Sequence, residues 1–322
     1  MRLLRSICLL GLVLLVPASA VWAQGAAGYP NQTVRIINPF TAGSVSDILG
    51  RALADKLSTL WGQPVIVENK PGVAGTISVG KATPDGYTLM STSNGHTILN
   101  ALNKGLPVDS TKDFAGVSQI ASVPLVLVVA PTVPAKNLKE LLALARAQPG
   151  KLNFTSAGLA SSNFLAGELL KQTAKIDIAH VPFRGTPEQF TSLMRGDSQL
   201  SMAFMGNAIP FIQGGQVKAL AIATPKRVPQ LPDVPTMAEA GLPEYRYDSW
   251  FAIMAPAGTP KPIIKKISDD IATILKTPEM QARWQTLGAI PLVSTPEELD
   301  AIIRADTARY GKLLENAGVK AQ

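Results

Sequence analysis

The sequence has few of the side chains that most often carry metal or covalent chemistry. Among 322 residues there is one cysteine, Cys8, and there are two histidines, His96 and His180. Cys8 lies in an N-terminal segment that we expect to be removed, so the mature chain should have no disulfide, thiol nucleophile or thiolate metal site. Two histidines without an acidic cluster also make a poor metal site. We therefore predict no metal and no cofactor.

Motifs for catalysis and for nucleic-acid binding are also missing. No Gly-x-Ser-x-Gly turn is present to expose a nucleophilic serine, although a Ser-His-Asp site stays arithmetically possible. Residues 75–81 have the glycine and lysine spacing of a phosphate-binding loop, but Ala82 stands where such a loop needs Ser or Thr. The net charge of +7 is spread along the chain without a basic cluster interleaved with aromatics. We expect neither an enzyme nor a nucleic-acid-binding protein.

The N-terminus has the pattern of an export signal. A basic start, residues 1–5, precedes an apolar run, residues 7–16, and the small-residue cleavage sequence Val21-Trp22-Ala23. This order predicts a secretory signal peptide over residues 1–23. The apolar run is shorter than the ~20 residues that span a membrane, and no later run reaches that length. We therefore expect an exported protein without a membrane anchor.

Strand-like and helix-like segments alternate through the mature chain, which predicts an α/β fold with largely parallel sheets. The length allows two lobes, because single domains usually have ~100–200 residues. Extended apolar segments at 124–131 and 249–256 suggest two crossing strands. We predict lobe 1 from residues 24–128 and 252–322, lobe 2 from residues 129–251, and a ligand cleft between them.

The first βα unit illustrates the kind of site that such a fold can carry. An apolar strand runs through a Gly-containing turn into a helix with Leu and Ile at helical spacing. Ser44 or Ser46 can cap this helix, and Asp47 lies in its first turn. A helix start presents free backbone N–H groups that can bind anions. Taken alone, however, the stretch is an ordinary, well-capped connection.

Four turns rich in Gly, Ser, Thr or Asn each follow a strand-like segment. We expect them at the carboxyl ends of strands, where α/β folds bind ligands. Such turns offer N–H groups and hydroxyls without a fixed counter-ion, which suits a carboxylate. His96 lies in one of them and is as consistent with a pocket residue as with a structural one, whereas His180 closes an apolar strand and is expected to be structural. The turns are residues 40–47, 93–97, 156–163 and 184–186.

A series of short motifs resembles the Bug family, the extracytoplasmic solute receptors of tripartite tricarboxylate transporters. The motifs occur in order over essentially the whole mature chain, which makes the resemblance far more specific than any one of them. They include Pro39-Phe40-Thr41-Ala42-Gly43, Val67-Glu68-Asn69-Lys70-Pro71-Gly72, Pro84-Asp85-Gly86-Tyr87-Thr88-Leu89, Val181-Pro182-Phe183-Arg184-Gly185, Leu231-Pro232-Asp233-Val234-Pro235-Thr236 and Ala255-Pro256-Ala257-Gly258-Thr259-Pro260.

The resemblance implies a periplasmic protein with a two-lobed, type II-like binding-protein fold, in which two Rossmann-like lobes close on a small organic carboxylate. In that family one carboxylate is held largely by backbone N–H groups and hydroxyls of the first βα turn and of its counterpart in the second lobe. Carried over by position, the candidate ligand-binding residues are Phe40, Ala42, Gly43, Ser44, Ser46, Asp47, Ser93, Asn94, His96, Ser156, Ala160, Ser161, Ser162, Asn163, Gly185 and Thr186.

The implied function is capture of a small organic acid for uptake by a membrane permease of the tripartite tricarboxylate type. We expect the receptor to be a monomer. The alternative is a ligand-dependent receptor that acts on a membrane sensor through the same cleft. A hydrolase is the least favoured hypothesis, because the motifs that it needs are missing.

Four residues at three sites depart from the family's pattern. Ser44-Val45 stand where a Gly pair is usual. Ala160 replaces a common Gly, and Phe164 replaces a common His. The two bulkier side chains, Val45 and Phe164, should make the cleft less polar. We therefore predict a monocarboxylate or dicarboxylate with an apolar or aromatic body rather than a citrate-like ligand.

Overall fold

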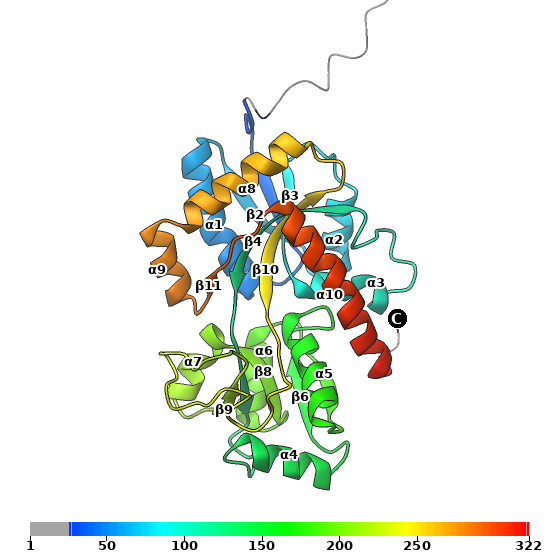
Figure 1. Ribbon diagram of the computed structural model, residues 1–322, viewed down its shortest axis with the longest axis vertical. Coiled ribbons are helices and arrows are strands. Elements are labelled where there is room, and N and C mark those ends of the chain that lie inside the picture. The colour runs from blue at the N-terminus through cyan, green and yellow to red at the C-terminus, as the bar shows by residue number, and fades with distance from the viewer. Residues whose placement is uncertain (1–25, 27, 320, 322) are drawn as a thin grey trace, which may run out of the picture.

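Two β-sheets, one in each lobe, organise the computed structural model of this protein (Figure 1). It describes residues 26, 28–319 and 321, so the predicted signal peptide and Cys8 lie outside the described residues. The upper lobe in Figure 1 contains the early and the late parts of the chain, and the lower lobe contains the middle. The chain therefore passes from one lobe to the other twice.

The first lobe is built around a six-stranded sheet in the order β11-β4-β10-β3-β1-β2. β1 lies parallel to β2 and to β3, as expected of βα units. The strands are β1 (Val34–Asn38), β2 (Val65–Asn69), β3 (Thr88–Ser93), β4 (Phe114–Ser122), β10 (Trp250–Pro256) and β11 (Ile290–Pro291). The helices are α1 (Val45–Trp61), α2 (Val73–Gly80), the 3-10 helix η1 (Asn94–Ile98), α3 (Leu99–Leu102), α8 (Lys261–Leu275), α9 (Pro278–Thr286) and α10 (Pro296–Asn316).

Both faces of the first sheet are buried under helices. Successive strand residues point to opposite faces, so Ile36 packs with Leu53 of α1. Its neighbour Ile37 packs on the other face with Val79 of α2 and Leu299 of α10. A sheet covered on both faces needs apolar residues throughout its central strands. This explains the continuous apolar runs in the sequence.

The second lobe is built around a five-stranded sheet in the order β7-β6-β8-β5-β9. Its strands are β5 (Leu125–Val129), β6 (Asn153–Ser156), β7 (Ala179–Pro182), β8 (Leu200–Phe204) and β9 (Lys218–Ile222). Its helices are α4 (Leu138–Ala147), α5 (Ser162–Ala174), α6 (Thr186–Arg195) and α7 (Met205–Gln213). Phe190 of α6 packs on one face with Val126 and Val128. Phe164 of α5 packs on the other face, where the core continues into the first lobe.

Both sheets are mixed, which corrects the prediction of largely parallel sheets. β10 runs antiparallel to β3 and β4, and β5 runs antiparallel to β8 and β9. β5 and β10 are the strands by which the chain enters a lobe from the other lobe. They therefore run away from the cleft, whereas β1, β3 and β6 of the βα units run towards it. Alternation of strands and helices in a sequence does not record this direction.

Strand pairing places the first passage between the lobes at Val123 and Pro124, between the end of β4 and the start of β5. The boundary expected after residue 128 falls inside β5, which pairs with β8 over its whole length. The return passage ends at β10, so the boundary expected after residue 251 falls inside that strand. Val123 N–H donates to the Ser249 carbonyl at 2.9 Å, so the two passages lie side by side.

The start of α1 is capped as the sequence predicts, and the start of α6 is not. Ser44, rather than Ser46, caps α1 by accepting a hydrogen bond from Asp47 N–H. Thr186 and Gln189 have the sequence spacing of a capping box, which predicts Thr186 as the N-cap, but Gly185 is the N-cap of α6 and Thr186 is its first residue. The glycine and lysine run at 75–81 lies almost entirely within α2 rather than in a phosphate loop. Of the helices in the described part of the chain, none has the length and apolar character to span a membrane.

Candidate ligand-binding site

A cavity of about 240 Å³ lies between the two lobes. The first lobe contributes the β1–α1 turn, the start of α2 and the segment from β3 to α3, and the second lobe contributes the β6–α5 turn and the start of α6. These segments follow strands β1, β2, β3, β6 and β7 at their carboxyl ends. The described residues that line the cavity are Pro39, Phe40, Thr41, Ser44, Pro71, Gly72, Val73, Thr76, Thr92, His96, Leu99, Leu102, Asn103, Ala157, Gly158, Leu159, Ala160, Arg184, Gly185 and Thr186.

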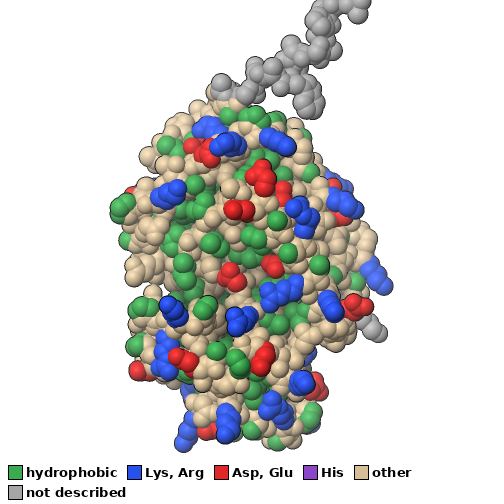
Figure 2. Space-filling model, viewed as in Figure 1, with side chains coloured by type: hydrophobic (Ala, Val, Ile, Leu, Met, Phe, Trp, Pro, Cys, Tyr) green, Lys and Arg blue, Asp and Glu red, His purple; other side chains and the backbone are tan. Residues whose placement is uncertain are grey.

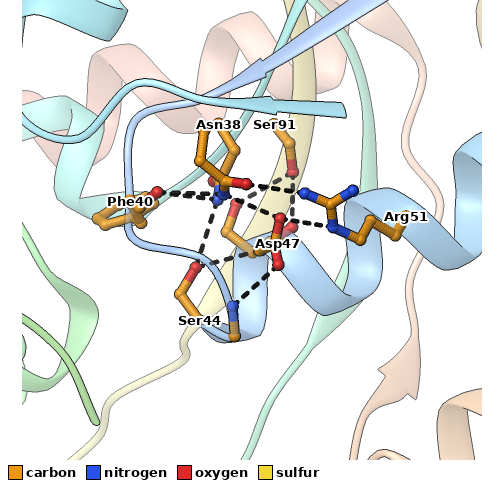
Figure 3. Close-up of polar contacts among 9 residues, drawn as sticks. Asn38, Phe40, Ser44, Asp47, Arg51 and Ser91 are labelled. Carbon is orange, nitrogen blue, oxygen red and sulfur yellow. Dashed lines mark hydrogen bonds and ion pairs between the residues drawn. The ribbon is translucent and has the colours of Figure 1, made fainter. Parts of the chain in front are cut away.

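The β1–α1 turn is held by a network of polar contacts behind the cavity wall (Figure 3). Asn38 Nδ2 donates to the Phe40 carbonyl and to Ser44 Oγ, both at 3.3 Å. The Asp47 carboxylate accepts from Gly43 N–H and from Arg51 Nε, both at 2.9 Å. Asp47 is 4% exposed and does not line the cavity. Its carboxylate fixes the turn, and Phe40 and Ser44 are the predicted residues of this turn that reach the cavity.

The hydrogen bonds to Asp47 also set its acidity. Burial alone would raise the pKa of this carboxyl group, but the hydrogen bonds from Gly43 N–H, Arg51 and Asn69 outweigh burial and lower the pKa below its usual value. Asn69 Nδ2 donates to Asp47 Oδ1 at 2.9 Å and to the Phe40 carbonyl at 3.3 Å. Asp47 is therefore ionised at neutral pH and fully engaged with protein groups.

The β6–α5 turn of the second lobe is held by neutral groups. Ser161 caps α5 by accepting from Phe164 N–H, and Asn163 Oδ1 accepts from Ala157 N–H at 3.3 Å. Ser156 Oγ lies 2.7 Å from His180 Nε2, and this imidazole packs against the rings of Phe154 and Phe164. Ser156, Ser161 and Asn163 lie behind the wall, and residues 157–160 form it.

Asn94 links the two lobes instead of lining the cavity. It is fully buried, and its Nδ2 donates to Tyr247 Oη at 2.9 Å. Its Oδ1 accepts from Ser162 Oγ at 2.5 Å, at the start of α5 in the second lobe. Close to this link, a Cβ at Gly95 would overlap the Ala160 carbonyl oxygen. Only a glycine allows the lobes to approach this closely at position 95.

His96 lines the cavity from the first lobe. It is 2% exposed, and its Nε2 lies 2.8 Å from the Ser110 carbonyl. A carbonyl can only accept, so Nε2 carries the proton. Burial lowers the pKa of His96 to about 4 against the effect of this hydrogen bond, so the ring is neutral at pH 7. The sequence left the role of His96 open, and the structure places it in the cavity wall.

The charge on the cavity wall comes from the second lobe. Arg184 precedes α6 and is exposed at the edge of the cavity. No other described lining residue carries a positive charge at pH 7, and none is acidic. Figure 2 shows basic and acidic side chains mixed over one face of the protein, so the basic charge is not gathered into a single patch on that face. No group of three His, Asp or Glu side chains able to hold a metal occurs in residues 28–319.

Some of the predicted ligand-binding residues thus line the cavity, and others lie behind its wall. Those that line it are Phe40, Ser44, His96, Ala160, Gly185 and Thr186. Those that do not are Ala42, Gly43, Ser46, Asp47, Ser93, Asn94, Ser156, Ser161, Ser162 and Asn163. Val45 and Phe164, which were expected to make the cleft less polar, pack in the core. The apolar wall comes instead from Phe40, Val73, Leu99, Leu102 and Leu159.

Sequence reasoning missed the contribution of the turn after β2 and of α3. Gly72 and Val73 lie in a Gly-rich stretch of the sequence that was not predicted to bind a ligand. No sequence pattern marks Thr76 or Thr92 as a lining residue. Arg184 stands in one of the polar turns and is the cation nearest to the predicted residues Gly185 and Thr186. A search for charge next to the predicted turns would have found it.

Comparison with known proteins identifies the family. The family described as "Tripartite tricarboxylate transporter family receptor" matches residues 49–319. The solved structure of periplasmic binding protein BugD has a TM-score of 0.83 and 31% identity, and covers 91% of this chain and 100% of that chain.

Two further solved structures contain small dicarboxylates. A structure from R. palustris with adipate has a TM-score of 0.84 and 31% identity, over 91% of this chain and 100% of that chain. MatC from Rhodopseudomonas palustris with bound malate has a TM-score of 0.80 and 32% identity, over 89% and 100%. These matches agree with the motif resemblance and with the two-lobed fold. The chain therefore belongs to the tripartite tricarboxylate transporter receptor family, as a Bug-type periplasmic solute-binding receptor.

Proposed function

We propose that this receptor captures a small organic carboxylate between its lobes and delivers it to a membrane permease of the tripartite tricarboxylate type. The observation that carries the proposal is the wall of the cavity between the lobes, which joins a cation and free helix starts to a largely apolar surface. In this proposal residues 1–23 direct export and are removed, and the mature protein acts as a monomer in the periplasm.

Two helix starts and one arginine support binding of a carboxylate. Gly72 and Gly185 are the N-caps of α2 and α6, and neither helix has a side-chain cap. The free backbone N–H groups of their first turns, to which Pro187 of α6 contributes none, and the positive ends of their dipoles favour an anion, although Glu188 already lies in the first turn of α6. Arg184 adds a charge beside α6, and the described lining residues hold no carboxylate to compete for it. A ligand carboxylate is the group that best fits this end of the cavity.

The rest of the wall supports a small ligand with an apolar body. A volume of about 240 Å³ lies below the ~300–1,000 Å³ of pockets for drug-sized molecules. Phe40, Leu99 and Leu159 offer apolar contact. We infer a monocarboxylate or dicarboxylate with an apolar or aromatic body. Adipate and malate, which are bound to relatives, are both dicarboxylates, and the four methylenes of adipate form such an apolar body.

Closure of the cleft is part of the proposal. A Cβ at Gly185 would lie 2.9 Å from Thr41 Oγ1, and a Cβ at Gly95 would overlap the Ala160 carbonyl oxygen. The lobes are therefore in close contact at two places within the turns that line the cavity. We propose that the lobes separate by bending at the two crossing segments and close on the ligand. Closure brings the wall of each lobe to the same molecule and removes water around its carboxylate.

The test begins with mass spectrometry of molecules that remain bound to the purified protein, followed by a thermal-shift screen of organic acids. A ligand at 100 times its Kd should stabilise the protein by about 2.7 kcal/mol. Arg184→Gln should weaken binding of the best acid by about tenfold, or about 1.4 kcal/mol.

Arg195→Gln is the matched control, because it removes the same charge from the exposed end of α6, outside this cavity. It should leave the affinity unchanged. If no organic acid stabilises the protein, or if both variants weaken binding equally, carboxylate capture in this cavity is wrong.

A further inference from the structure

A further contact between the lobes lies away from the cavity. It joins the start of α7 in the second lobe to the turn between α9 and β11 in the first lobe. A Cβ at Gly206 would overlap the Leu287 carbonyl oxygen, and a Cβ at Gly288 would lie 2.8 Å from the Cα and the backbone nitrogen of Gly206. The two backbones therefore lie in direct contact. We call Gly206, Leu287 and Gly288 the rear contact, and none of the described residues that line the cavity belongs to α7, α9 or β11.

The rear contact and the cavity lie on opposite sides of the crossing strands. In the first sheet β11 lies beside β4, whereas β3, β1 and β2, whose carboxyl ends lead into the cavity wall, lie beyond β10. Figure 1 shows α7 and α9 towards the left of β4 and β10, and α3 and α5 towards the right. A rotation about the crossing segments that parts the walls of the cavity therefore presses the rear contact together.

Each half of the rear contact is tied to the first crossing segment. In the first lobe Trp284 Nε1 of α9 donates to the Ile120 carbonyl of β4 at 2.8 Å, and β11 pairs with the end of β4. In the second lobe Met205 N–H donates to the Pro124 carbonyl at 2.9 Å. Trp284 is fully buried, so the turn after α9 cannot leave β4 without loss of core packing. Neither half can yield without moving the crossing segment.

We propose that the rear contact is a fulcrum that resists opening of the cleft, so that Gly206 sets the balance between the open and closed forms. The inference rests on the proposed function, because it assumes that the lobes close on a carboxylate. Packed atoms resist further approach, so opening against this contact carries an energy, and glycine at position 206 keeps that energy small. A ligand that binds only the closed form gains apparent affinity as that form becomes more populated.

The test adds one methyl group to the rear contact. In Gly206→Ala the new Cβ would press on the Leu287 carbonyl more strongly in the open form than in the closed form, so the variant should favour closure. Adipate and malate serve as probes in titration calorimetry. A probe that binds the wild type should bind Gly206→Ala about three- to tenfold more tightly. X-ray scattering should show that the ligand-free variant is more compact than the wild type.

Two other glycines give the matched comparisons. Gly95→Ala adds its methyl group on the cavity side, against Ala160, and should weaken binding and open the ligand-free protein. Gly311→Ala should change neither, because its Cβ meets nothing within 4 Å. In the double variant Gly95→Ala/Gly206→Ala the two methyl groups act on opposite sides of the crossing strands. Their effects should therefore oppose each other, and the affinity should return towards that of the wild type.

Hydrogen exchange tests the same inference without a substitution. In the wild type, exchange in residues 93–97 and 157–161 should slow when adipate or malate binds, because the cavity side closes. Exchange in residues 205–208 and 286–289 should stay unchanged, because the rear contact is made in both forms.

The outcomes separate this inference from the proposed function. If Gly206→Ala binds the probe no more tightly than the wild type does, or if exchange slows equally on both sides, the inference is wrong and carboxylate capture stands. If no organic acid binds the wild type, the proposed function is wrong, and scattering by the ligand-free variants decides whether the rear contact controls opening. Should Gly206→Ala fail to fold, hydrogen exchange of the wild type decides.

Discussion

The two βα turns that face each other across the cavity have similar geometry and different chemistry. In each, a serine caps the helix, Ser44 in the first lobe and Ser161 in the second. In each, a side chain in the first turn of the helix accepts a hydrogen bond from the preceding turn. That acceptor is charged in the first lobe, where Asp47 meets Gly43 N–H, and neutral in the second, where Asn163 meets Ala157 N–H.

The difference shows which part of such a turn is fixed by geometry. The cap and the acceptor that closes the turn are needed on both sides, and the charge is not. The carboxylate of Asp47 also accepts hydrogen bonds from Arg51 and Asn69, whereas the amide of Asn163 donates to Gln189 Oε1 at 3.3 Å. The two halves of the wall should therefore respond differently to substitution and to pH.

The largest effect should come from separating the two halves of the wall. In Gly95→Ala the new Cβ would overlap the Ala160 carbonyl oxygen, so the lobes could not approach as closely. Overpacking of about 1–3 kcal/mol in the closed form corresponds to a loss of affinity of about five- to 150-fold. Calorimetry with the best ligand measures it, and X-ray scattering reports whether the protein is more open.

Gly311→Ala in α10 is the control, since a Cβ there meets nothing within 4 Å. Its affinity and its scattering curve should match those of the wild type. Unchanged binding by Gly95→Ala would show that closure does not bring position 95 against Ala160.

A smaller effect should distinguish the charged acceptor of the first turn, Asp47, from the neutral acceptor of the second, Asn163. Asp47→Ala should reduce the free energy of unfolding by about 2 kcal/mol at pH 7, because it removes hydrogen bonds to a charged group. Asn163→Ala should cost about 1 kcal/mol, because its bonds are neutral. Urea unfolding at pH 7 gives both values, and equal losses would mean that the charge adds nothing.

The loss from Asp47→Ala should also depend on pH. The pKa of Asp47 is lower in the folded protein than the ordinary 3.8, so its contribution is full above about pH 4 and disappears as the pH falls through the folded pKa. The stability curves of the wild type and of Asp47→Ala should therefore converge in strong acid. The curve of Asn163→Ala should stay parallel to that of the wild type.

The last effect should appear in the second lobe, and only at milder acidity. Burial, helped by Lys171, lowers the pKa of His180 to about 4 from its usual 6.5, so protonation opposes folding. Stability is full above about pH 6.5 and falls towards pH 4. His180→Gln cannot take up this proton and should remove about 1–2 kcal/mol of that fall. Unfolding at pH 7, 5.5 and 4.5 measures it.

His96 has a similarly lowered pKa, so part of the fall should persist in His180→Gln. The difference between the two curves isolates His180. Identical slopes in the wild type and the variant would mean that this imidazole is not kept neutral by the fold.

Much of the fold could be predicted because it depends on neighbours in the chain. The helical period of α1, the cap at Asn137 and the strand ends at the polar turns are all local signals. The directions of β5 and β10 could not be predicted, because they depend on pairing with strands far away in the sequence. The passage falls at the start of the expected segment 124–131, but the exact lobe boundary could not be predicted for the same reason, since an apolar strand such as β5 suits either sheet.

The site was predictable as a set of turns but not as a set of side chains. Each turn lies at the end of a strand, and the fold brings these ends together. Whether a side chain faces the cavity depends on its own hydrogen bonds. Asp47 was predicted to contact the ligand, but its carboxylate bonds to its own turn. Leu99 and Leu102 were not among the predicted residues, but they line the cavity.

The neighbouring passages at Val123 and Ser249 have a genetic consequence. Residues 125–222, which form the whole second sheet, are one uninterrupted piece of the chain, entered and left at adjacent points. Recombination between related genes at these points would exchange the Arg184 side of the pocket and leave the His96 side untouched. A family built this way can combine halves with different preferences in single events, without altering the strands that support either half.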